Sequence, residues 1–79
     1  MGRVSWQERI VVDPTIHHGD PCVRGTRVPV TMIVGSIADG MSPQEVIEEY
    51  PQLTLDDVSA ALAYAAEVMR QESLLPLAT

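Results

Sequence analysis

Apolar residues recur with helical spacing through most of the second half of the chain, which predicts three consecutive helices. The first segment carries its apolar residues on one predicted face: Val30, Ile33, Val34, Ile37 and Ala38. The pair Asp39-Gly40 is expected to end this helix, because glycine readily takes the left-handed conformation found just after helix ends.

The start of the middle helix is marked by a complete capping pattern. Ser42 stands at the N-cap, Pro43 at the first helical position and Glu45 three residues after the cap. The residue before a proline is pushed out of the α region, so Tyr50-Pro51 is expected to stop the helix. The middle helix is therefore expected to be only about two turns long.

The last helix is expected to begin after Thr54, which stands at a second N-cap, and to continue to about Gln71. Asp56 and Asp57 suit the positive end of this helix. Its apolar residues follow a 3-4-3-4 spacing, typical of a helix packed lengthwise on another: Leu55, Val58, Leu62, Ala65 and Met69. A span of roughly 26 Å exceeds what a small three-helix core needs, so its second half is expected to continue beyond the domain. A short helix joined by a tight corner to a longer one is the layout of a helix-turn-helix.

Short β-branched runs separated by turn residues precede the helices. One run covers residues 9–13 and ends at an Asp-Pro pair, a second covers residues 22–24, and residues 27–28 resume extended structure. We expect a small hairpin-like or three-stranded β-unit that must lie on the helices or pair with another chain. The predicted organisation is a flexible N-terminus at residues 1–8, unless Trp6 packs on the domain, then a single domain at 9–72 and a C-terminal tail at 73–79.

Composition favours a small cytoplasmic protein that associates with itself. The 79 residues include no Phe and one Trp, so the core must be built from small aliphatic side chains, and a homodimer is expected to add burial. The single cysteine excludes an intrachain disulfide and suits a reducing cytosol. The chain has neither the roughly 20 apolar residues of a membrane span nor a secretion signal.

The distribution of charge argues against ordinary DNA binding by the helices. The net charge is −6, yet residues 1–27 sum to +1 and residues 28–79 to −7. A protein that holds DNA phosphates with its own helices is expected to be basic there. The acidic residues of the helical half are interpreted mainly as caps and a solvated face, and otherwise as contacts for a basic partner.

Catalytic or metal chemistry finds little support in the sequence. A zinc site needs about four ligands, and His17-His18 have only Cys22 and Asp20 near them, so they are interpreted as solvated loop residues. Cys22 would need a base to act as a nucleophile and is interpreted as a semi-buried structural thiol. We expect no enzyme activity, metal or cofactor, because the chain offers no phosphate loop and no triad.

Two arginines near a glycine turn, in Arg24-Gly25-Thr26-Arg27, are the strongest candidate polar site. Together with backbone N–H groups they are suited to hold a phosphate or carboxylate. The alternative is a structural turn whose arginines pair with Asp13, Asp20 or Glu49. Five residues are named as candidate DNA contacts: Arg24, Thr26, Arg27, Thr54 and Ser59.

The chain also resembles a known family through motifs that occur in one order over about residues 9–66. These motifs are Ile10…Asp13-Pro14, Gly19-Asp20-Pro21-Cys22-Val23-Arg24-Gly25-Thr26-Arg27-Val28-Pro29-Val30, Gly40-Met41-Ser42-Pro43-Gln44-Glu45-Val46, and Tyr50-Pro51-Gln52-Leu53-Thr54…Asp57-Val58…Ala60-Ala61-Leu62…Tyr64-Ala65. They resemble the domain of unknown function 433 family. The resemblance implies a mainly α fold, in which a trihelical, homeodomain-like or winged-helix-like helix-turn-helix follows a short β-hairpin segment. It also implies a VapB-like antitoxin, encoded beside a toxin with a PIN-like nuclease fold.

Two functions from different classes remain open at this stage. One is an antitoxin that neutralises a PIN-like ribonuclease by direct binding and, as a dimer, represses its operon by binding operator DNA. The other is an interaction or assembly module without a DNA role. Five apolar residues at the end of the last helix and in the tail are named as candidate partner contacts: Leu62, Ala65, Met69, Leu74 and Leu75.

Overall fold

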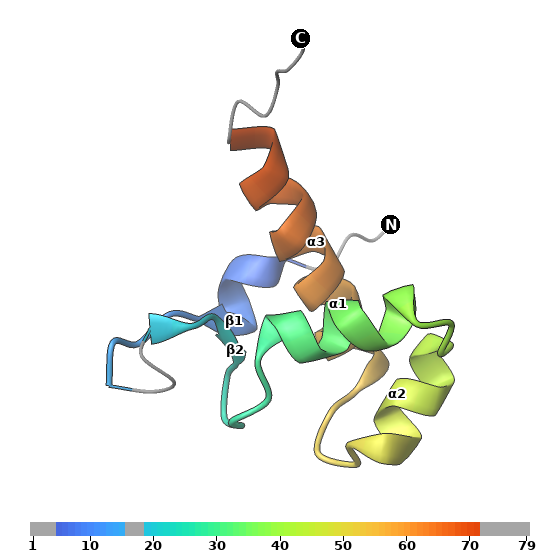
Figure 1. Cartoon of the computed structure of the whole chain (residues 1–79). Coiled ribbons are helices and arrows are strands. Elements are labelled where there is room, and N and C mark those ends of the chain that lie inside the picture. Colours follow the sequence, from blue (N-terminus) through green and yellow to red (C-terminus); the bar gives the residue numbers. More distant parts are fainter. Residues whose placement is uncertain (1–4, 16–18, 72–79) are drawn as a thin grey trace, which may run out of the picture.

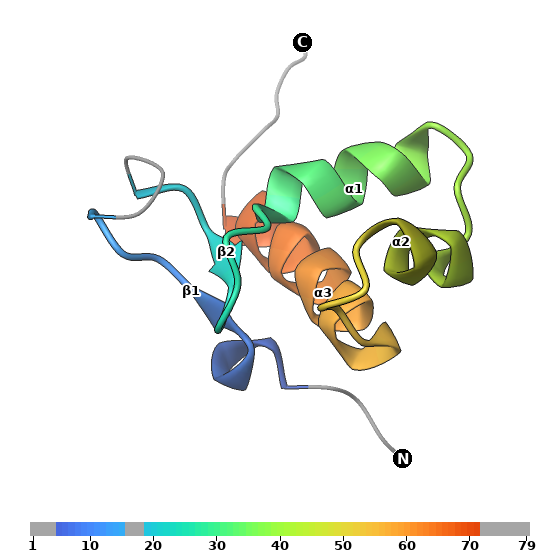
Figure 2. The same cartoon turned by 90° about the horizontal axis from the view of Figure 1, so that it is seen from below.

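Three helices preceded by a two-stranded antiparallel hairpin make up the fold, which is mainly α as the sequence predicts (Figure 1). The computed structural model describes residues 5–15 and 19–71. The elements run in the order η1 (Trp6–Glu8), β1 (Ile10–Val11), β2 (Cys22–Val23), α1 (Val30–Ala38), α2 (Pro43–Glu49) and α3 (Leu55–Gln71). Figure 2 shows the three helices grouped together, with the hairpin and η1 to one side.

Of the two β-units that the sequence predicts, the structure forms the hairpin and not the three-stranded unit. Ile10 pairs with Val23 and Val11 with Cys22, whereas the expected third strand is reduced to a single bridge between Cys22 and Pro29. The first strand ends early because Asp13 closes a local turn, in which its Oδ1 accepts hydrogen bonds from the backbone N and the hydroxyl of Thr15. These two bonds, the backbone one first, lower the pKa of the Asp13 carboxyl.

The helix boundaries follow the capping residues. Ser42 and Glu45 form the predicted capping box, with Glu45 N donating to Ser42 Oγ at 3.1 Å and Ser42 N donating to Glu45 Oε1 at 2.8 Å. α2 ends at Glu49, before the Tyr50-Pro51 pair. Gly40 follows α1 with a φ of 104°, the left-handed conformation expected just after a helix end. The turn between α2 and α3 completes the helix-turn-helix layout.

The core lies where the three helices meet the hairpin. Its largest fully buried side chains come from four elements and are Ile33, Val23, Val46, Val58 and Cys22. Aliphatic residues of α1, α2 and α3 thus share one cluster with the strand residue Val23. The short strands are stabilised by this contact with the helices, as expected for strands that are too short to stand alone.

The predicted lengthwise seam on α3 is only partly correct. Leu55 and Met69, at its two ends, are 47% and 61% exposed, whereas Ala60 and Ala61 in the middle are fully buried. The reason is that α3 packs against α1, α2, η1 and β1 rather than along one parallel partner. Contact from several directions buries a wide central patch. Only the last turns of α3 extend beyond the other helices, rather than its whole second half, because Tyr64 packs on Trp6 (Figure 1).

Trp6 packs on the domain, so the N-terminal segment is not the flexible one expected in the absence of such a contact. Its ring lies 4.9 Å from that of Tyr64 between centroids, in an edge-to-face arrangement at 76°. Aromatic pairs favour this geometry, because the positive ring edge meets the negative ring face. Residues 5–8 therefore belong to the packed part of the molecule.

Candidate functional site

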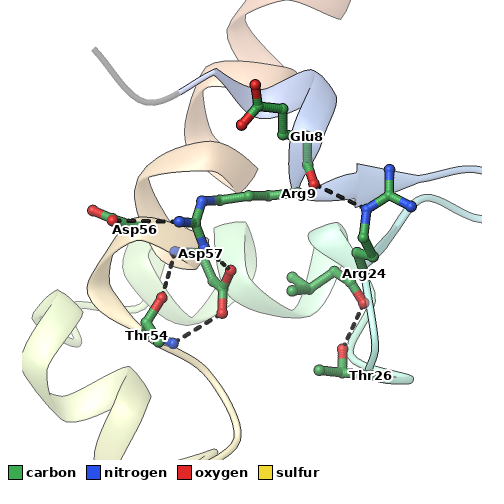
Figure 3. A network of polar contacts seen from close by, with 8 residues as sticks. Glu8, Arg9, Arg24, Thr26, Thr54, Asp56 and Asp57 are labelled. Carbon is green, nitrogen blue, oxygen red and sulfur yellow. Dashed lines mark hydrogen bonds and ion pairs between the residues drawn. The ribbon is translucent and has the colours of Figure 1, made fainter. Parts of the chain in front are cut away.

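A polar network joins the start of α3 to the N-terminal segment, and Asp57 is its centre (Figure 3). Thr54 N donates to Asp57 Oδ2 at 3.0 Å, and Asp57 N donates to Thr54 Oγ1 at 3.1 Å, which completes a second capping box. The other oxygen, Oδ1, accepts from Arg9 Nη1 at 3.1 Å. Asp57 is 8% exposed, so its carboxylate is largely shielded from water, whereas the Arg9 side chain is 37% exposed.

Arg9 covers the first turn of α3. Besides Asp57, it reaches Asp56 Oδ2 at 3.5 Å, a looser pair whose carboxylate side chain is 62% exposed. Exposed pairs of this kind stabilise a fold little, so the bond to Asp57 matters more. Sequence analysis did not identify Arg9 as part of a site, because its partner lies 48 positions away and no local pattern signals the pairing.

Arg24 extends the network toward the hairpin. Its Nε donates to the carbonyl of Glu8 at 2.9 Å, and its backbone N donates to the carbonyl of Arg9 at 2.7 Å. The Arg24 guanidinium thus holds the backbone at Glu8 in place. It does not form the ion pair with Asp13, Asp20 or Glu49 that a purely structural role for the turn predicted. Figure 3 shows its terminal nitrogens turned away from the Glu8 carbonyl. A cavity of about 270 Å³ lies here, lined by Glu8, Arg9, Arg24 and Asp57.

The remaining candidate DNA contacts come from two parts of the chain, the turn after β2 and the start of α3. The Thr26 hydroxyl donates to the carbonyl of Val23 at 2.8 Å and accepts from Val28 N at 3.0 Å, so it serves the turn. The Thr54 hydroxyl caps α3. Arg27 and Ser59 are both exposed, but Arg27 lies on the turn after β2 and Ser59 on α3.

An apolar groove lies between the start of α1 and the second half of α3. Its volume is about 320 Å³, and its lining is almost entirely apolar. The lining residues are Pro21, Val30, Thr31, Val34, Tyr64, Ala65, Val68 and Met69. Two candidate partner contacts, Ala65 and Met69, line it, whereas Leu62 packs against the core. Leu74 and Leu75 lie outside the described residues.

Cys22 has the environment of a structural thiol. It is buried, and its Sγ donates to the carbonyl of Asp20 at 3.4 Å. Burial raises the pKa of the thiol, the Asp20 carboxylate raises it further, and Arg27 lowers it. A raised pKa keeps the thiol in its neutral, poorly nucleophilic form.

The described residues contain no cluster of three or more His, Cys, Asp or Glu side chains arranged to hold a metal ion. His17 and His18 lie outside the described residues. Over the same ranges, no helix combines the length and the apolar character needed to cross a bilayer.

Most of the chain matches the model of one protein family. Residues 10–65 match the family described as "Protein of unknown function (DUF433)", which covers the hairpin, all of α1 and α2, and most of α3. The chain therefore belongs to the DUF433 family, as its motifs indicate.

Two relatives agree with this assignment. A crystal structure of a DUF433 member protein from Anabaena variabilis superimposes with a TM-score of 0.75 at 34% identity, covering 82% of this chain and 64% of that one. The uncharacterized protein y4eO of Sinorhizobium fredii is 39% identical over 59 residues, or 75% of this chain. The chain spans about a quarter (27%) of the length of that relative.

Proposed function

We propose that this protein is the antitoxin of a type II toxin-antitoxin pair and neutralises a PIN-like ribonuclease by direct binding. The observation that carries the proposal is the acidic surface of α2 and the first turn of α3, formed by Glu45, Glu48, Glu49 and Asp56. All four residues are exposed. A ribonuclease that binds an RNA backbone needs a basic surface, and complementary charge guides and orients such partners.

The acidic surface has a rigid support. Glu45 and Asp56 stand in helix first turns that are held by two capping boxes, and Asp56 also pairs with Arg9 at 3.5 Å. Glu48 and Glu49 follow on the exposed side of α2, whose opposite side buries Val46. A preorganised surface loses less conformational entropy when it binds.

Reversing charge on α2 tests this contact. Glu48→Lys with Glu49→Lys should weaken inhibition of the PIN-like nuclease encoded beside this gene by at least about tenfold, because attraction to a basic surface becomes repulsion. The measurement is cleavage of a single-stranded RNA by that nuclease, titrated with wild-type or variant protein.

Glu67→Lys is the matched control for the single variant Glu48→Lys, because each reverses one charge, and Glu67 lies near the end of α3 rather than on α2. It should leave inhibition unchanged. Equal effects of the two variants would show that net charge alone matters, and the absence of any complex between the wild-type proteins would refute the proposal itself.

In this proposal, any contact with operator DNA is made by Arg24 and Arg27 of the turn after β2. Both residues are exposed, and the chain is basic only in its N-terminal part. The first turn of α3, which enters the major groove in an ordinary helix-turn-helix, presents the exposed Asp56, while Asp57 is buried against Arg9. The Asp56 carboxylate repels phosphates, so that turn is not expected to supply the affinity.

Arg24→Ala with Arg27→Ala should therefore weaken binding to the upstream region of the gene and flatten its salt dependence by about one unit of slope per lost phosphate contact. Gel-shift titrations over several salt concentrations measure both effects. Ser59→Ala, at an exposed position of α3, is the control and should bind like the wild type. If the arginine variant bound like the wild type and Ser59→Ala abolished binding, α3 would be the recognition helix and this part of the proposal would be wrong.

One observation favours the second function, an interaction module without a DNA role. The groups at the start of α3 are already occupied, since Thr54 caps the helix and Asp57 pairs with Arg9. If neither the protein alone nor its complex with the nuclease shifts the upstream DNA, this second function is favoured.

A further inference from the structure

We propose that a second copy of this chain packs into the apolar groove between α1 and the second half of α3, giving a two-fold symmetric dimer. This surface is separate from the acidic surface of α2. The dimer would therefore leave the surface proposed for the nuclease available.

The apolar lining of the groove favours the binding of apolar side chains. Val30 and Val34 of α1 and Val68 of α3 face a space of about 320 Å³ with almost no polar lining. Burying a charged or polar group there would cost desolvation without returning a hydrogen bond. Burying aliphatic side chains would instead remove apolar surface from water on both partners.

The groove and the exposed Met69 side chain belong to the same apolar patch. Met69 lies at the edge of the groove and is 61% exposed, next to the hollow lined by Tyr64 and Val68. A two-fold interface places one patch against an identical patch, so each part must find its complement within it. Met69 of each copy would fill the groove of the other, and methionine adapts well to such irregular spaces.

A small residue of α3 lines the groove and would let a second copy approach closely. This residue is Ala65, which is half-buried in the isolated chain. Alanine side chains allow helix axes to come within the short range of interhelical distances. The last turns of α3 extend beyond the other helices and are open to such packing (Figure 1).

Charge favours a second copy over a basic partner at this place. Near the groove, Glu67 and Arg70 pair at 3.2 Å, so the local charge is balanced. Asp56 lies thirteen positions before Met69 on α3, a separation of about 20 Å along the axis. Charges this far apart are screened beyond a Debye length of about 8 Å, so the acidic ends of two copies would repel little.

Sedimentation equilibrium of the full chain from low to high micromolar concentration tests the proposal. The expected mass is twice the 8.6 kDa of one chain. Met69→Glu should weaken dimerisation by at least about tenfold, since each copy would bury a carboxylate in an apolar groove. Leu55→Glu is the matched control, because it changes an exposed apolar residue at the other end of α3 and should leave the dimer intact.

Three results would overturn the proposal. The first is equal dimerisation by the two variants, with helicity by circular dichroism unchanged. The second is a monomeric wild type that dimerises only as Leu74→Asp with Leu75→Asp, which would assign the groove to the chain's own tail. The third is a monomer whose binding to the nuclease is lost in Met69→Glu, which would assign it to that partner.

Discussion

Replacing Ile33 with alanine is expected to lower the free energy of unfolding by about 2–5 kcal/mol. Ile33 has no exposed surface and lies in the core cluster with residues of the other helices and of β2. The loss combines the missing apolar burial with the cavity that the neighbours cannot fully close. A domain of this length has about 4–12 kcal/mol of stability in total, so the change removes a large share of it.

Urea denaturation followed by circular dichroism measures the effect. Met32→Ala is the control, because Met32 is the preceding residue of α1 and is 42% exposed, and it should cost less than about 1 kcal/mol. Ile33→Val should lie between them, at about 0.5–1.5 kcal/mol. If Ile33→Ala and Met32→Ala shifted the midpoint equally, the described position of α1 over the core would be wrong.

Asp57→Ala is expected to lower the free energy of unfolding by about 2–3 kcal/mol. The substitution removes the acceptor for Thr54 N and the ion-pair partner of Arg9 in one step. Arg9 would be left without its closer partner, although its side chain is 37% exposed and regains some hydration. This exposure keeps the expected loss below that of a fully buried ion pair.

Two further variants separate the parts of this effect. Asp56→Ala changes the neighbouring carboxylate, whose side chain is 62% exposed, and should shift the urea midpoint by an equivalent of less than about 0.5 kcal/mol. Asp57→Asn keeps an oxygen to accept from Thr54 N but removes the charge opposite Arg9, so its loss should be intermediate. Equal midpoints for Asp57→Ala and Asp56→Ala would contradict the network.

In the proposed function, the Arg9–Asp57 pair is one reason why the start of α3 does not read DNA. Asp57 completes the capping box with Thr54 and, through Arg9, links the start of α3 to the N-terminal segment. Moving this helix end into a groove of DNA would expose carboxylates to phosphates. The acidic surface and the apolar groove are the two surfaces proposed to bind proteins. The first lies on α2 and the first turn of α3, and the second is lined by α1 and the second half of α3.

The sequence determined the helices because their signals are local. Ser42 and Glu45, like Thr54 and Asp57, lie three positions apart, and each pair forms its bonds within one helical turn. Pro51 and Gly40 acted on the backbone of their immediate neighbours. The family also followed from the order of motifs along the chain.

Only the tertiary structure decided which residues meet across the chain. Nothing near Arg9 indicated a bond to Asp57, and the periodicity of α3 placed Leu55 and Met69 on a seam that packing leaves exposed. Periodicity identifies a helix face but not how many elements surround it. The groove needed Pro21, residues of α1 and residues of α3 together, and such a surface exists only once those elements are packed.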